Sequence, residues 1–451
     1  MKIIIVGCGK VGVTLAEKLN RENHDITLID SDSETLRSVA DSIDVMSVTG
    51  NGAIYQVQME AGIADADLLI ATTNSDELNM LCCLIAKKAG NCHTIARIRN
   101  PEYSSEISFI REELNLSLAI NPELAAAHEI SRLLRFPSAI KIDTFAKGRI
   151  ELLKFIIPGH SKLDHMKIME VSTKLKCNVL ICVVERGRDV VIPGGNFELQ
   201  AGDKISFIAS QKDSMDFFQK VGVVNNGVKS VMIIGGGKLT YYLARLLKDT
   251  KIKIKIIEQN FERCNELSEL LPYAMIIHGD GSDQQLLAAE GLSQIEAFAS
   301  LTGFDEENIM LSLYAASQSN AKLITKVNRT AFEDVVNSLN LGSVIYPKLL
   351  TADIILQYVR AMQNSLGSNV ETLYRIADDR AEALEFRVGK DAPMVGIPLE
   401  KLKLKNNLLV ACINRNGRII TPRGKDTIEV NDTVIIVTTN KGLNDLKDIL
   451  K

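Results

Sequence analysis

Residues 2–12 read KIIIVGCGKVG, and residues 230–240 read SVMIIGGGKLT. In each stretch a continuous apolar run follows the first residue, which is typical of a parallel strand buried on both faces. The run leads into a Gly-rich turn, of the form G-x-G-x-x-G at Gly7, Gly9 and Gly12. Such glycines permit a tight turn, close approach of a pyrophosphate and close helix packing. The pattern predicts phosphates bound at the N-terminus of the following helix.

The two stretches belong to a long internal duplication. The interval that separates Gly7 from Gly235 also separates Asp30 from Glu258. The interval between Arg97 and Lys326 is longer by a single position. A repeat of this length, about half the chain, is a duplicated domain, because solenoid units repeat every 20 to 50 residues or so. The chain therefore carries a nucleotide-binding module twice.

Strand and helix patterns alternate through each copy, which predicts an open sheet with helices on both faces. Each copy is followed by a shorter segment in which a strand, a turn, a Pro-Gly turn and a closing strand succeed one another. We therefore expect an α/β chain with two Rossmann-like, doubly wound parallel sheets, each followed by a small β-rich α+β domain. The expected domains are residues 1–136, 137–224, 228–367 and 368–451.

An acidic residue ends the second predicted strand of each copy, Asp30 in the first and Glu258 in the second. A carboxylate at this place accepts hydrogen bonds from both ribose hydroxyls and repels a 2′-phosphate. The position favours NAD over NADP.

Two further segments of the first copy carry polar groups. Residues 71–79 read ATTNSDELN and follow the fourth predicted strand at its carboxyl end, where open α/β sheets bind ligands. Arg97 and Arg99 alternate along the fifth predicted strand, so we expect them on one face. Two guanidinium groups on one face suit a phosphate or an acidic surface, and an ion-pair network remains the alternative.

Composition limits the class of protein. Among the 451 residues, 46% are hydrophobic and 24% are charged, and the net charge is −4. This balance is ordinary for a globular protein and argues against a nucleic-acid partner. No apolar run reaches the roughly 18 residues of a membrane span, and the N-terminus enters a strand without a leader pattern. We expect a cytoplasmic protein without direct membrane insertion, with reduced, buried cysteines and no metal site.

The small domains bear on whether the chain is an enzyme. A dehydrogenase needs a general acid or base beside the nicotinamide. The second small domain has no histidine, and its one cysteine, Cys412, lies in an apolar run. We expect no enzymatic activity and no catalytic residue. Two alternatives remain: a soluble NAD-dependent oxidoreductase, and a nucleotide or redox sensor that acts on another partner.

The order of these motifs, including ARIRNPEY at residues 96–103, resembles the domains that regulate the conductance of potassium (RCK domains, also described as KTN followed by TrkA-C). The resemblance covers essentially the whole chain. It implies a regulatory subunit that binds NAD(H), with ATP and ADP as further candidates. It also implies a tetrameric ring on the inner face of the plasma membrane, attached through a TrkH- or TrkG-like potassium transporter subunit.

The resemblance also implies the site residues. The nucleotide at the first copy would meet Gly7, Cys8, Gly9, Lys10, Val11, Gly12, Asp30, Asn51, Thr72, Thr73 and Arg97. The nucleotide at the second copy would meet Gly235, Gly237, Glu258, Asp280 and Lys326.

The second copy departs from this pattern. Thr240 replaces the third glycine, Leu301 replaces Thr72, and Lys326 replaces Arg97. The first copy departs at Asn51, where the second keeps the Asp280 that the family often has. Thr240 adds bulk where helix and strand approach, and lysine lacks the fork of arginine. We expect the second site to be weaker, differently selective or empty.

Overall fold

A computed structural model describes residues 1–136, 138–145, 150–223, 227–329, 333–339, 341–364, 370–377, 380–443 and 445–451. The chain divides into two compact units, each made from two separate segments. The first unit contains Met1–Ser131 and Lys229–Leu356, and the second contains Arg132–Val228 and Gln357–Lys451. The expected domain boundaries at residues 137, 224, 367 and 368 lie outside the described residues.

The first parallel sheet has the strand order β3-β2-β1-β4-β5-β6. Its strands are β1 (Lys2–Val6), β2 (Asp25–Asp30), β3 (Met46–Thr49), β4 (Leu68–Ala71), β5 (His93–Arg97) and β6 (Leu118–Ile120). All neighbouring strands in it run parallel. The order reverses between β1 and β4, and ligands bind at such a switch point, beyond the carboxyl ends of the strands.

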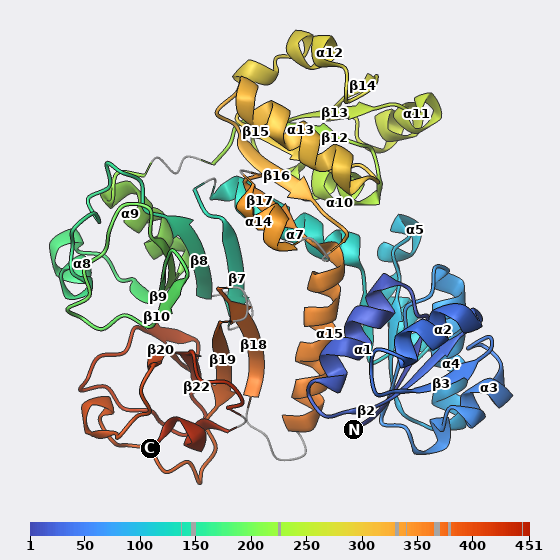
Figure 1. Cartoon of the computed structure of the whole chain (residues 1–451), viewed down its shortest axis with the longest axis horizontal. Coiled ribbons are helices and arrows are strands. Elements are labelled where there is room, and N and C mark those ends of the chain that lie inside the picture. The colour runs from blue at the N-terminus through green and yellow to red at the C-terminus, as the bar shows by residue number, and fades with distance from the viewer. Residues whose placement is uncertain are drawn as a thin grey trace. The chain divides into compact units, whose positions relative to one another are not determined.

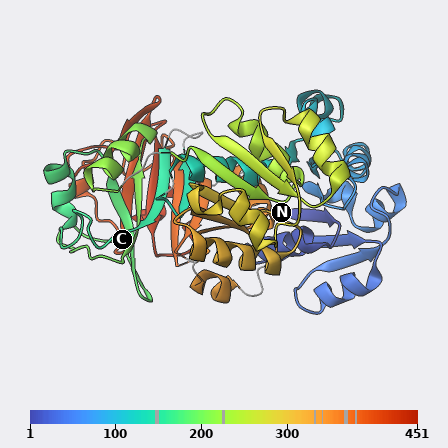
Figure 2. The same ribbon diagram turned by 90° about the horizontal axis from the view of Figure 1, so that it is seen from above.

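Helices lie along both faces of this sheet (Figures 1 and 2). The helical segments of the first module are α1 (Lys10–Asn20), α2 (Ser33–Ala40), α3 (Tyr55–Glu60), α4 (Asp76–Ala89), α5 (Pro101–Ser104), α6 (Ile107–Glu113), α7 (Pro122–Arg135) and the 3₁₀ turn η1 (Ile63–Asp65). Asp32 and Ser75 accept hydrogen bonds from the first turns of α2 and α4, as N-cap residues do. Helix α1 has no side-chain cap, because Gly9 occupies that position.

The second parallel sheet repeats this arrangement, in the order β14-β13-β12-β15-β16-β17. Its strands are β12 (Ser230–Ile234), β13 (Lys253–Glu258), β14 (Met275–His278), β15 (Ala297–Ser300), β16 (Lys322–Lys326) and β17 (Ser343–Ile345). Its helices are α10 (Lys238–Leu247), α11 (Phe261–Leu270), α12 (Gln284–Ala289), η3 (Leu292–Gln294), α13 (Asp305–Gln318), α14 (Glu333–Ser338) and α15 (Pro347–Asn364).

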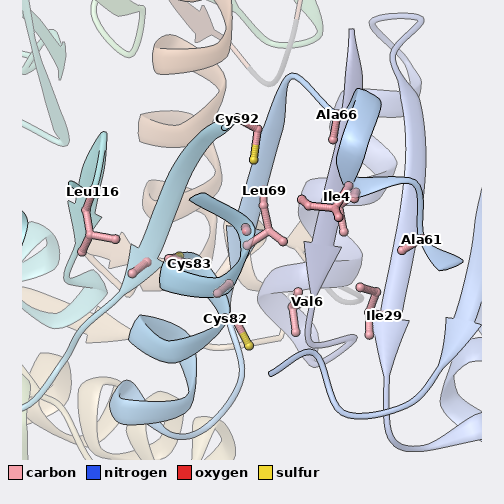
Figure 3. Close-up of a cluster of buried hydrophobic side chains, with 14 of the residues drawn as sticks. Ile4, Val6, Ile29, Ala61, Ala66, Leu69, Cys82, Cys83, Cys92 and Leu116 are labelled. Carbon is pink, nitrogen blue, oxygen red and sulfur yellow. The ribbon is translucent and has the colours of Figure 1, made fainter. Parts of the chain in front are cut away.

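One core cluster of the first module lies between the sheet and α4 (Figure 3). Ile4, Val6 and Leu69 of the central strands pack there with Cys82 and Cys83 of α4. All eight cysteines of the chain are buried and free, as expected. Burial raises the pKa of the Cys82 thiol to about 12, which removes its reactivity as a thiolate near neutral pH.

The second unit contains two antiparallel sheets, in the orders β10-β9-β11-β8-β7 and β18-β19-β22-β20-β21. The first sheet has β7 (Lys141–Phe145), β8 (Ile150–Ile156), β9 (Leu180–Arg186), β10 (Asp189–Val191) and β11 (Lys204–Ala209), with α8 (Ile168–Leu175) and α9 (Gln211–Lys220). The second has β18 (Val370–Ile376), β19 (Ala381–Arg387), β20 (Leu408–Arg415), β21 (Arg418–Ile420) and β22 (Thr433–Thr438), with η4 (Leu399–Lys401) and η5 (Leu446–Ile449).

The two antiparallel sheets share one apolar core, to which Phe145, Cys182, Cys412 and Ile435 all contribute. The predicted fold class is therefore confirmed, with two Rossmann-like sheets and two small β-rich domains. Within the described residues, no helix combines the length and the apolar character needed to cross a lipid bilayer. The same residues contain no group of three or more His, Cys, Asp or Glu side chains placed to hold a metal ion.

Candidate functional site

The Gly-rich turn of each module joins the central strand to an uncapped helix. Gly7 and Gly235 have φ values of 98° and 97°, in the left-handed region that favours glycine. Gly9 and Gly237 are the N-cap residues of α1 and α10. A Cβ atom at either of them would meet no atom within 4 Å. The space in front of both turns is open to the free N–H groups of a helix N-terminus, which is the arrangement that binds phosphates.

The third position of the turn differs between the copies. A Cβ atom at Gly12 would lie 1.9 Å from the carbonyl oxygen of Gly7, so no side chain fits there without a shift of the backbone. Thr240 stands at this position in the second copy, fully buried, and its hydroxyl donates to the carbonyl of Gly235 at 2.5 Å. In the first copy the hydroxyl of Thr72 reaches the Gly7 carbonyl, at 3.3 Å. The second turn therefore has room for the Thr240 side chain.

The two acids lie against the turns. Asp30 accepts a hydrogen bond from the N–H of Cys8 at 2.6 Å, and Glu258 accepts one from the N–H of Gly236 at the same distance. The Cys8 thiol is buried, and burial together with the charge of Asp30 raises its pKa to about 12. The Cys8 thiol therefore stays protonated near neutral pH, and one carboxylate lies against each Gly-rich turn.

The other residues expected at the sites, in the first turn and after the third strand of each copy, differ in how far their side chains are exposed. Lys10 is exposed beside the open space, whereas Val11 is buried in the core. Asn51 and Asp280 follow β3 and β14 and accept hydrogen bonds from the N–H groups of Ala53 and Ser282. Of the residues assigned here to the first nucleotide, Lys10 and Asn51 present exposed polar side chains and Val11 does not.

The loop after β4 uses its polar groups internally. The N–H and hydroxyl of Thr73 both donate to Oδ1 of Asn79, at 2.8 and 2.7 Å. Asn79 in turn donates to the carbonyl of Arg97. In the second copy the N–H of Thr302 likewise donates to Asn308, which donates to the carbonyl of Lys326. The Thr302 hydroxyl differs, since it donates to the carboxylate of Glu307 at 3.1 Å. These hydrogen bonds hold each loop in place beside its Gly-rich turn.

Arg97 is 8% exposed, and its guanidinium donates to the carbonyl of Thr73. Its Nε has no hydrogen-bond partner among the described residues. Burial, followed by the charge of Arg99, lowers the pKa of Arg97 to about 10. Lys326 likewise donates to the carbonyl of Thr302, at 2.9 Å, and burial lowers its pKa. Both side chains are positive groups held at the edge of their sites.

Arg99 does not continue the strand as expected. Strand β5 ends at Arg97, because the N–H groups of Arg99 and Asn100 donate to the carboxylate of Asp76, at 2.8 and 2.7 Å. The Arg99 guanidinium still lies near that of Arg97, since it donates to the carbonyl of Asn74 in the same loop. Asp76 therefore pins this loop besides starting α4.

A contact between the two modules escaped the sequence reasoning. The hydroxyl of Tyr242, on α10 of the second module, donates to the carbonyl of Arg99 at 3.0 Å and accepts from Asn121 at 2.9 Å. Lys18 of α1 pairs with Asp353 of α15 at 2.6 Å, and α1 and α15 lie side by side (Figure 1). No local sequence pattern marks these partners, because each pair joins the two halves of the duplication.

The family model for the TrkA-N domain matches residues 3–122 and 231–347, and the model for the TrkA-C domain matches residues 152–222 and 383–451. The chain is also 31% identical to the Trk system potassium uptake protein TrkA of Halomonas elongata, over 98% of this chain and 96% of that protein. This chain belongs to the TrkA family. A homologue from Methanosarcina mazei, TrkA homolog 2, is 29% identical over the full length of both chains.

Solved structures support the same fold at lower identity. The RCK domain of the GsuK channel has a TM-score of 0.64 at 16% identity and covers 98% of this chain and 92% of its own. The GsuK channel bound to NAD has a TM-score of 0.63 at 15% identity, covering 98% and 77%. The expected resemblance to potassium-conductance domains is confirmed. The TrkA-family relatives named here are potassium uptake proteins, which agrees with the expectation that this chain is not an enzyme.

Proposed function

We propose that this TrkA-family chain is a cytoplasmic regulatory subunit of a Trk-type potassium transporter, gated by NAD(H) with ATP and ADP as competitors. The observation that carries the proposal is the pair of uncapped helix N-termini behind Gly9 and Gly237. Each faces open space and stands beside a carboxylate, Asp30 or Glu258. That set of groups matches the phosphates and ribose of an adenine dinucleotide.

The first site consists of the Gly7–Gly12 turn with Asp30, Asn51, the Thr72–Thr73 backbone and Arg97. The second consists of Gly235, Gly237, Glu258, Asp280 and Lys326. Because Thr240 is accommodated by its bond to Gly235, the bulk at the third position does not close the second turn. We propose that both sites bind nucleotide, the second with a different preference.

Gating follows from differential binding. A ligand shifts an equilibrium only if it binds one conformation more tightly than the other. A nucleotide that prefers one arrangement of the two modules would change the shape of an assembled ring. Coupling of about 1–3 kcal/mol would change the open fraction of the transporter roughly 5- to 150-fold.

The ring itself needs a contact surface. Leu81 on α4 and Met310 on α13 stand at equivalent positions of the two copies, and they are 45% and 66% exposed. Exposed apolar side chains at the same place in both modules suit a heterologous contact that closes a ring. We propose that these faces join chains into a tetramer, which docks on a TrkH- or TrkG-like subunit at the inner face of the plasma membrane.

The test is calorimetric titration of the purified chain with NADH, NAD, ATP and ADP, followed by potassium uptake into vesicles that contain the transporter. Binding of one or two nucleotides per chain without loss of nicotinamide absorbance, and a nucleotide-dependent change in uptake, are the expected results. Turnover of nicotinamide would favour the oxidoreductase alternative. Absence of binding by all four nucleotides would end the proposal.

A further inference from the structure

One buried tyrosine hydroxyl of the second module forms hydrogen bonds with two residues of the first. Tyr242 is 2% exposed, and its hydroxyl donates to the carbonyl of Arg99 while it accepts from the amide of Asn121. Burial is the largest influence on the Tyr242 phenol and raises its pKa, so the hydroxyl keeps its proton near neutral pH. Near neutral pH the Tyr242 hydroxyl is therefore a donor to the carbonyl of Arg99, from one module to the other.

Tyr242 lies on the helix that begins at the proposed second nucleotide site. It lies on α10, just over one turn after Gly237, the residue that begins the helix at the proposed phosphate position. A helix moves as a rigid rod over such a distance. A phosphate that pulls on the first turn of α10 would therefore displace the Tyr242 hydroxyl as well.

The residue that Tyr242 holds is equally close to the first site. The N–H of Arg99 donates to the carboxylate of Asp76, and the guanidinium of Arg99 donates to the carbonyl of Asn74. Asp76 and Asn74 belong to the loop that contains Thr72 and Thr73. The other partner, Asn121, accepts from the N–H of Leu124 and so fixes the start of α7.

The reverse contact differs. Thr14 stands in α1 at the position equivalent to Tyr242, and its hydroxyl donates to Lys10 within the same helix. Asn328 occupies the position equivalent to Arg99, and its carbonyl accepts from Lys348 of its own module. Among the described residues, the hydroxyl contact therefore runs from the second module to the first.

We propose that Tyr242 is a positioning residue for the first nucleotide site, contributed by the second module, and that it makes the first site respond to the ligand at the second. The inference rests on the proposed function. Discrete packed and hydrogen-bonded elements of this kind are the physical carriers of coupling between sites. The coupling is a free energy, so the ligand at the first site must affect the second reciprocally.

The test uses the full chain with Asp30→Ala, which is expected to weaken binding at the first site, and NADH or ADP as the probe for the second. Site-resolved hydrogen exchange follows the amides of Arg99 and Asn100. We expect the bound probe to slow their exchange about five-fold or more, the lower end of the usual allosteric range. Adding Tyr242→Phe is expected to abolish the ligand dependence, while Thr14→Val at the equivalent position of α1 leaves it intact.

Asn121→Asp provides a second variant, because it removes the amide donor to Tyr242 and keeps an oxygen for the N–H of Leu124. It should weaken the ligand dependence too. Slowing that survives Tyr242→Phe, or binding at the second site without any change at Arg99, would overturn the inference and leave the proposed function standing. Binding at the first site alone would do the same. A wild-type chain that binds neither NADH nor ADP would overturn both.

Discussion

The two Gly-rich turns solve one steric problem in two ways. In the first copy Gly12 leaves room for the Gly7 carbonyl, and the hydroxyl that bonds this carbonyl comes from Thr72, directly after the neighbouring strand β4. In the second copy Thr240 fills the room and supplies the hydroxyl itself, and Leu301 replaces the threonine of the loop. The two substitutions together exchange the source of one hydrogen bond. The effect of a substitution in the motif therefore depends on the residue that lies next to it in the structure.

The charges at the start of the two long helices differ more sharply. Glu123 follows the proline that begins α7, whereas Lys348 follows the proline that begins α15. Glu123 lies in the field of Arg97 and pairs loosely with Arg99 at 3.7 Å. Lys348 lies in the field of Lys10, Lys326 and Arg329, with Asp305 as the opposing charge. The duplicated modules thus place an acid at one helix start and a base at the other.

The largest effect is expected when the residue of the second copy replaces Gly12 in the first. We expect Gly12→Thr to lower the free energy of unfolding by about 3 kcal/mol, because the new Cβ would collide with the Gly7 carbonyl. Adding Thr72→Leu should recover part of this loss, since it transplants the complete arrangement. Urea denaturation measures both.

The matched control is Gly9→Ala, at a glycine whose Cβ would meet nothing within 4 Å and whose φ of −65° suits any residue. We expect it to cost less than about 1 kcal/mol of stability. A Gly12→Thr variant as stable as the wild-type chain would mean that the close approach at Gly12 is not a constraint. A double variant no more stable than Gly12→Thr alone would mean that Thr72 does not affect how a side chain fits at this position.

The second prediction removes the acid of one copy at a time. Asp30→Ala should weaken NAD(H) binding at the first site roughly 10- to 150-fold, because hydrogen bonds to a charged group are worth about 1.5–3 kcal/mol. Glu258→Ala should do the same at the second site. Calorimetry with NADH then assigns each binding event to a copy.

Asp30 also holds the N–H of Cys8, so a loss of affinity has two sources. Asp30→Asn separates them, since it keeps an oxygen for that N–H and removes the charge. Asp32→Ala, at the exposed cap of α2, is the control for a nearby acid that does not touch the turn. Unchanged affinity in Asp30→Ala would remove the ribose assignment.

Much of this structure was predictable, because local patterns fix it. The buried strands, the turns at Gly7 and Gly235 and the acids that end the second strands all follow from spacing. The hydrogen bond between Thr240 and the Gly235 carbonyl was not predictable. The sequence shows that threonine is larger than glycine, but it does not show the space that takes up the side chain. Nor was the end of β5 at Arg97 predictable, since it depends on the Asp76 carboxylate. The shared core of the small domains, with Cys182 and Cys412, joins segments from the two halves of the chain, which no local pattern relates.

The smallest expected effect concerns the base at the start of α15. Burial, with the charge of Lys10 next, lowers the pKa of Lys348 from 10.5 to about 8. The unfolded chain therefore binds more protons than the folded chain between these values, and stability rises with pH across that window. We expect Lys348→Met to raise the free energy of unfolding near pH 7 by about 1 kcal/mol. This is less than the pKa shift alone would give, because solvent screens a partly buried charge. The gain should vanish by pH 10.5, whereas Lys251→Met, at an exposed surface lysine, should give no such profile. A gain that is independent of pH would instead assign the effect to packing of the new side chain.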